Sequence, residues 1–256
     1  MNRLSLPMKP ATALLAMLAL TGGAAADTIV GDLTWTTGQT IDVTENLIIQ
    51  GTLNVEPGVT VNVVNGAEII VQSGGVLNVQ ASDAQPAIFQ PVSGRWDGLH
   101  FEAGASGSLS HAAVRGAVGS AVHVSGASVS MEGCEISDVR ASGQEQSAYG
   151  IFASNDAQID VAWSNIFDVV GPTGNDGDGG PGGTIVSEAA DGNNGHVDGY
   201  NGPHAGHGGD GDDGNHGGDA AGIRLISGAT ASVSYSRIFA ITGGDGGAGG
   251  FGGSGS

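Results

Sequence analysis

Positive charge is the scarcest property of this sequence. Lysine and arginine together supply 7 of the 256 residues, against 26 aspartates and glutamates, and the formal net charge is −19 at pH 7. Proteins that bind nucleic acid through its phosphates need clustered basic side chains, so this balance argues against a nucleic-acid partner. Aromatic residues make up only 5% of the chain and charged residues 13%, which argues against a conventional large globular core.

Cysteine is almost absent as well. The single cysteine, Cys134, has no partner for an internal disulfide. Convincing helical periodicity is also missing after residue 26. The sequence therefore predicts neither a disulfide scaffold nor a helical bundle.

The first 26 residues have the three zones of a secretory signal peptide. Arg3 and Lys9 form a basic start, 11–20 is an apolar run, and 21–26 (TGGAAA) supplies small residues for cleavage after Ala26. Ten residues span only about 15 Å of helix, too little for a membrane span. We therefore expect a secreted or cell-surface protein without a transmembrane segment. Removal of 1–26 takes away two bases and no acid, which leaves five arginines, 26 acids and a formal charge of −21.

What the chain does have is glycine, 48 residues of it, between short runs of alternating apolar residues. Over 47–79, apolar residues recur at every second position and Gly, Asn and Pro-Gly interrupt them. Such short alternating runs predict many short β-strands. The apolar positions are Leu53, Val55, Val59, Val61, Val63, Ile69, Val71, Leu77 and Val79.

An internal repeat predicts how these strands are arranged. Residues 150–171 match 222–243 at an offset of 72 without a gap, and 127–139 match 157–169 at an offset of 30. Each unit is too short to bury its own apolar face, so stacked units would fuse their inward rows into one core. The matched columns are Met131, Val161 and Val233; Ile136, Ile166 and Ile238; and Val139, Val169 and Ile241. Cys134 shares a column with Ser164 and Ser236, which predicts a small inward-facing residue, not a nucleophile.

This repeat resembles the right-handed parallel β-helix (pectate-lyase-like) superfamily. Residues 96–101 (WDGLHF) are similar to the Trp-x-Gly-Ile-x-Phe coil of bacterial surface β-helices. The resemblance implies an all-β, right-handed parallel β-helix, a fold that carries enzymes and inert shafts alike. The predicted organisation is a signal peptide over 1–26, an N-terminal cap region over 27–46, β-helix coils over 47–171, an insertion over 172–221, a further coil over 222–243, and the start of a second glycine-rich insertion over 244–256.

The insertion at 172–221 contains 17 glycines and four of the seven histidines, but no lysine or arginine. Small residues recur every third position from Gly199 to Ala220, a period that fits polyproline-II-like helices. Low hydrophobicity and high charge fit disorder equally well, so both interpretations stay open.

A calcium site is a further hypothesis for this insertion. Residues 208–213 (GGDGDD) are similar to the calcium-binding nonapeptide of RTX proteins, and Gly217 starts a second copy nine residues later. That resemblance implies Asp210, Asp212, Asp213 and Asp219 as ligands, although Asn215 stands where the motif has an apolar residue. The alternative is a solvated acidic face.

The sequence contains no recognisable catalytic arrangement. The five arginines left after residue 26 are far apart, and each is expected to lie on the surface beside acids. Asp138 and Asp168 share a repeat column, which predicts a stack at a solvated corner. His100, His111 and His123 have no Ser or Cys partner at a meaningful spacing, so we expect surface or coil residues.

These observations leave three hypotheses about function. The first is an exported, nonenzymatic β-helix, structural or adhesive, with surface glycans or cell-surface proteins as partners. The second is a polysaccharide lyase or glycoside hydrolase whose site is unrecognised or missing, and the third is a calcium-binding repeat protein. Because no cap is visible after 243, the sequence also suggests a fragment of a longer protein.

Overall fold

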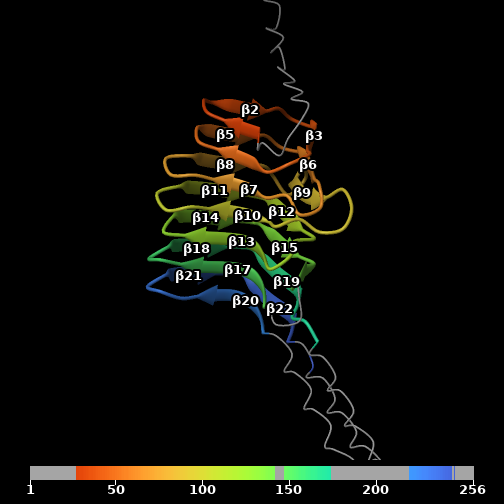
Figure 1. Ribbon diagram of the computed structural model, residues 1–256, viewed down its shortest axis with the longest axis vertical. Helices are drawn as coiled ribbons and strands as arrows, with labels where there is room; N and C mark the ends of the chain where they lie inside the picture. The colour runs from red at the N-terminus through yellow and green to blue at the C-terminus, as the bar shows by residue number, and fades with distance from the viewer. Residues whose placement is uncertain (1–26, 142–146, 174–218, 244, 246–256) are drawn as a thin grey trace, which may run out of the picture.

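The computed structural model describes residues 27–141, 147–173, 219–243 and 245, and these ranges contain strands and no helix. Strands follow one another in threes, and each pairs in parallel with strands of the neighbouring coils. The predicted all-β, right-handed parallel β-helix is confirmed. Figure 1 shows the coils stacked from β2 at one end to β20 and β22 at the other.

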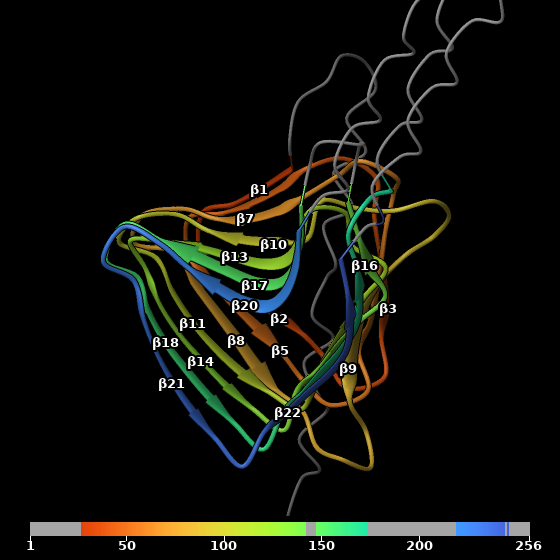
Figure 2. The ribbon, with the colours of Figure 1, turned by 90° about the horizontal axis from the view of Figure 1, so that it is seen from below.

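The coils form three sheets, which we call A, B and C and which appear in cross-section in Figure 2. Sheet A contains β1 (Asp27–Ile29), β4 (Leu47–Ile49), β7 (Ile69–Val71), β10 (Leu99–Phe101), β13 (Ser120–Ser125), β17 (Ala148–Ser154) and β20 (Ala220–Leu225). Sheet B contains β2 (Leu33–Trp35), β5 (Thr52–Val55), β8 (Val76–Gln80), β11 (Ser106–Ser110), β14 (Ser128–Glu132), β18 (Gln158–Ala162) and β21 (Thr230–Ser234). Sheet C contains β3 (Thr40–Val43), β6 (Thr60–Val63), β9 (Ala87–Pro91), β12 (Ala112–Arg115), β15 (Glu135–Ser137), β16 (Val139–Arg140), β19 (Asn165–Val170) and β22 (Arg237–Thr242).

The register of the strands follows the sequence repeat. Met131 pairs with Val161, which pairs with Val233, and Ile136, Ile166 and Ile238 align in the same way. Sheet A continues from β17 to β20 at the same offset of 72, with Ala148 opposite Ala220. Successive coils are therefore neighbours in space even where 50 residues lie between them in the chain.

The core is one continuous apolar column inside the coils. Every second residue of a strand is buried because successive side chains point to opposite faces of a sheet. The nine apolar positions predicted over 47–79 are all buried, none more than 1% exposed. Trp96, Phe89 and Phe101 are the largest fully buried side chains and fill the widest part of this interior.

Residues 27–46, the expected N-terminal cap region, contribute three strands, β1, β2 and β3, which pair in parallel with β4, β5 and β6. The last described coil begins at Ala220, within the final residues of the range assigned to the insertion. Residues 1–26, 174–218 and 246–256 lie outside the described residues, and with them the expected signal peptide and the conformation of the glycine-rich segments.

Candidate functional site

Three of the four predicted calcium ligands, Asp210, Asp212 and Asp213, lie outside the described residues. Asp219 is exposed and directly precedes β20, where its backbone carbonyl accepts a hydrogen bond of 2.9 Å from the Ala148 N–H. Within the described part of the chain, no three His, Cys, Asp or Glu side chains lie close enough together to hold a metal ion. The calcium site therefore stays a prediction.

Cys134 occupies the structural column that the repeat predicted. Its backbone N–H donates to Ser164 Oγ at 3.0 Å, and the Ser164 N–H donates to Ser236 Oγ at 3.1 Å. The Cys134 thiol is buried and donates to the Leu109 carbonyl at 3.2 Å. Burial raises the pKa of this thiol to about 11, so it is neutral and poorly nucleophilic near neutral pH.

The stacked aspartates Asp138 and Asp168 are held by arginines. Arg95 Nη2 lies 2.9 Å from Asp138 Oδ1, and Arg140 Nη2 lies 2.9 and 3.0 Å from the two oxygens of Asp168. Arg140 also approaches Asp138 at 3.4 Å, so charges alternate along the corner. Both arginines donate to backbone carbonyls as well, which gives them a structural role.

Two further arginines lie on the last described coil. Arg224 is on β20 in sheet A, whereas Arg237 is on β22 in sheet C, with its guanidinium carbon 5.1 Å from the centre of the Phe239 ring. The two therefore belong to different sheets and do not form one anion-binding pair. Arg115, by contrast, is paired with Glu135 at 2.8 Å.

A cluster of titratable groups on the outward face of sheet A escaped the sequence analysis. His100 on β10 stacks on His123 on β13, with ring centres 4.3 Å apart and planes 8° apart. The Nδ1 of His100 lies 3.0 Å from Glu68 Oε1, just before β7. Phe152 on β17 continues the row, with its ring centre 5.0 Å from that of His123. Coils of unequal length separate these residues, so no repeat alignment showed their proximity.

The cluster shifts the pKa of three of its members. The hydrogen bond to Glu68 raises the pKa of His100, while burial, followed by repulsion from His100, lowers the pKa of His123. Asp97, just before β10, has a raised pKa because of burial and then of the nearby Glu68 carboxylate. Groups with perturbed pKa values gather at functional sites, although structural networks produce them too.

His111 forms a second small arrangement at a corner between sheets B and C. Its Nδ1 lies 3.0 Å from Ser110 Oγ, and its Nε2 lies 3.2 Å from Asp83 Oδ1. The Asp83 side chain is 95% exposed, so it cannot hold the imidazole in one orientation as the buried acid of a hydrolase triad does. We assign this group no catalytic role.

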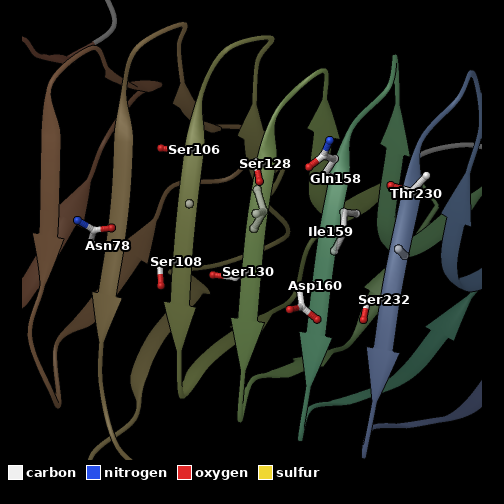
Figure 3. A pocket seen from close by; sticks show the side chains of 13 residues that line it. Asn78, Ser106, Ser108, Ser128, Ser130, Gln158, Ile159, Asp160, Thr230 and Ser232 are labelled. Carbon is white, nitrogen blue, oxygen red and sulfur yellow. The ribbon is translucent and has the colours of Figure 1, made fainter.

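The most extended polar surface is an open hollow of about 600 Å³ on the outward face of sheet B. Figure 3 shows polar side chains that project from neighbouring strands in two rows along the solenoid. One row is Ser106, Ser128, Gln158 and Thr230, and the other is Asn78, Ser108, Ser130, Asp160 and Ser232. We call these residues the sheet B hollow. The repeat alignment over 127–139, 157–169 and 229–241 contains most of these columns, so attention to its outward positions could have found them.

The polar groups of the sheet B hollow are largely unused within the protein. Among the described residues, only Asn78 spends its side chain on a neighbour, donating to Asn54 Oδ1 at 3.2 Å. Asp160 is the one carboxylate in the lining, and no lysine or arginine lines the hollow. The arrangement can therefore offer several hydroxyl, amide and carboxylate groups to a ligand at strand-to-strand intervals of about 4.8 Å.

Comparison of the chain with protein-family models, curated proteins and solved structures found no match. No helix long and apolar enough to cross a membrane occurs among the residues that the structure describes. The class that can be stated is that of a parallel β-solenoid with three sheets.

Proposed function

We propose that this chain is an exported, nonenzymatic β-helix of the pectate-lyase-like superfamily, structural or adhesive, which binds neutral glycans along the sheet B hollow. The observation that carries the proposal is the double row of uncommitted polar side chains in that hollow. Residues 1–26 support export, because they have the basic, apolar and small-residue zones of a cleavable signal peptide.

The chemistry of the hollow favours a polyhydroxylated ligand. Ser128 and Ser130 hydroxyls can donate and accept, the Gln158 amide can do both at separate atoms, and the Asp160 carboxylate accepts. Sugars present hydroxyls that match all of these groups. An open hollow that crosses several strands also admits a chain that extends beyond it at both ends, unlike the enclosed apolar pockets of small-molecule sites.

The charge of the chain favours a neutral glycan over an anionic one. The hollow contains a carboxylate and no base, and the whole chain after residue 26 carries a formal charge of −21. Polyuronates and sulfated glycans would meet repulsion at long range and find no cation at the surface.

A glycan array with the secreted chain, residues 27–256, tests the proposal. We expect binding to neutral polysaccharides, and loss of it in Ser128→Tyr, whose ring would occupy the hollow. Thr52→Tyr is the matched control, since Thr52 lies in the same row of sheet B but outside the lining. Absence of binding to every neutral glycan, or equal loss in both variants, would refute the assignment of the hollow.

Export itself is tested by the N-terminus of the protein recovered from outside an expressing bacterial cell. We expect the first residue to be Asp27, which is also the first residue of β1. Retention in the cytoplasm with an intact N-terminus would contradict this part of the proposal.

A second candidate function, cleavage of a polysaccharide, is favoured by the cluster on sheet A. A carboxyl group with a raised pKa, such as that of Asp97, can donate a proton to a leaving group, and Glu68 supplies a second carboxylate nearby. The test is the release of reducing ends from neutral and acidic polysaccharides, with Asp97→Asn as the inactive variant. Asp156→Asn, an exposed position remote from the cluster, is the control. If the unaltered protein releases no sugar, the cluster is structural.

A further inference from the structure

The last described coil leaves inward-facing apolar side chains open to solvent. Val233 is 47% exposed and Ile238 is 45% exposed, although Val161 and Ile166, in the same columns one coil earlier, are 1% and 0% exposed. The cause is that no strand within the described ranges pairs with the far edges of β20, β21 and β22. Three unpaired parallel edges around an exposed core form a template for further strands.

The opposite end of the solenoid has the complementary form. Strands β1, β2 and β3 pair with β4, β5 and β6 on one side only, as far as the described residues go. Leu33 is 37% exposed there, and Ile29 and Ile41 are partly buried. Figure 1 places these two ends at opposite extremes of the stack.

Continuing the register by one coil brings apolar side chains of the two ends together. The column that contains Val233 starts at Trp35, and the column that contains Ile238 starts at Ile41. In the same way Ala231, the smallest inward residue of β21, belongs to the column that starts at Leu33. Larger residues at the first coil would thus lie over smaller ones at the last, as interdigitated packing requires.

The end coils also carry opposite charge. The first coil, 27–46, contains four acids and no base, namely Asp27, Asp32, Asp42 and Glu45. The last described coil, 219–243, contains Arg224, Arg237 and a single acid, Asp219. In a chain with so few bases, this places a positively charged coil at one end and a strongly negative one at the other, which favours attraction between unlike ends.

We propose that the open end of the last coil binds the first coil of a second copy of this chain, so that exported chains join head to tail. Such an interface is heterologous and does not close on itself, so it builds a filament whose sheets A, B and C continue from copy to copy. The proposal uses one element of the proposed function, cleavage after Ala26, because cleavage leaves β1 at the start of the chain. It does not depend on glycan binding.

Sedimentation of the secreted chain, residues 27–256, over a range of concentrations tests this proposal. We expect species that grow beyond dimers as concentration rises, and unbranched filaments in negative-stain electron microscopy. A single monomeric species at every concentration, from a protein with a cooperative melting transition, would overturn the proposal.

Two variants block one end each. Ile238→Lys places a charge at the last coil, and Ile41→Lys places one at the first, where burial in the joint would leave the ammonium without a partner. Both residues are partly solvated in the single copy, so folding should persist, as far-ultraviolet circular dichroism can verify. Ser234→Lys is the matched control, because Ser234 shares the last coil with Ile238 but faces outward and should leave assembly intact.

Mixing the two blocked variants distinguishes head-to-tail joining from other association. Each variant alone is expected to be monomeric, whereas a 1:1 mixture is expected to form pairs and nothing larger, since one functional end of each kind remains. Persistent assembly of either variant alone, or a mixture without pairs, would contradict the head-to-tail interface. Loss of glycan binding with assembly retained would leave this inference intact and refute only the sheet B hollow.

Discussion

His100 and His123 lie face to face on adjacent strands of sheet A, with ring centres 4.3 Å apart, yet their pKa values shift in opposite directions. Glu68 accounts for the difference, because its carboxylate accepts a hydrogen bond from His100 and not from His123. A proton on His100 is thereby stabilised, and the same proton, together with burial, disfavours a second charge on His123.

This pair predicts a pH-dependent stability. The raised pKa of His100 contributes stability that is fully present below the ordinary histidine value, about 6.5, and is lost as pH rises through the raised pKa. His100→Gln should therefore lower the free energy of unfolding more at about pH 5.5 than at about pH 8.5. Urea denaturation at both pH values measures this difference, with Glu68 and Glu102 left in place. His123→Gln is the control and should show the opposite trend, because a lowered histidine pKa costs stability as pH falls.

Cys134 should be chemically silent while the protein is folded. Its pKa of about 11 leaves almost no thiolate near neutral pH, and the side chain is buried. We expect iodoacetamide to modify Cys134 only at the rate of unfolding, with mass spectrometry as the measurement. Cys134→Ser should change the free energy of unfolding by no more than about 1 kcal/mol, because serine already occupies this column at Ser164 and Ser236. Fast alkylation of the folded protein would contradict the structural assignment.

Gly150 is required by a close approach inside the stack. A Cβ at this position would meet the Ile166 side chain and the Gly222 carbonyl, so Gly150→Ala should destabilise the protein by about 1–3 kcal/mol. Gly31→Ala is the matched control, because nothing lies within 4 Å of the added Cβ there. Thermal melting of both variants measures the difference, and equal melting temperatures would show that the stack relaxes around the methyl group.

Arg140 joins two coils through Asp138 and Asp168 and through the Asp168 carbonyl. Its loss in Arg140→Met leaves two half-exposed aspartates with less positive charge nearby, and we expect a destabilisation of about 1–2 kcal/mol. Arg140→Lys should recover only part of this, since an ammonium cannot reproduce the forked geometry. Because Arg95 also pairs with Asp138, Arg95→Met is expected to be additive with neither change; a double-mutant cycle over Arg95 and Arg140 measures that coupling.

Metal removal tests the calcium interpretation of the glycine-rich insertion. Ligation by Asp210, Asp212, Asp213 and Asp219 predicts that EDTA lowers the melting temperature of the full chain and that calcium restores it. Magnesium at equal ionic strength is the control for a general effect of divalent cations. An unchanged melting temperature would favour the solvated acidic face.

Much of this fold could be predicted from the sequence because the coil is a local device. Alternation in 47–79 identifies inward residues without knowledge of their neighbours, and the offset of 72 identifies which coils stack. The columns of Met131, Val161 and Val233 and of Cys134, Ser164 and Ser236 were correct for that reason. The stack of Asp138 and Asp168 was predicted too, but not the arginines that hold it.

The sequence by itself determined the strand period, the inward face and the repeating column, because each follows from side-chain alternation and self-similarity. Only the tertiary structure decided which outward residues meet. Neighbours across a parallel ladder are separated by one coil, and the coils here range from 20 residues between Asp27 and Leu47 to 72 between Ala148 and Ala220. Glu68, His100 and His123 therefore come together through unequal spacings, and their shifted pKa values depend on a few ångströms of separation and on burial. Both quantities exist only once the coils have stacked.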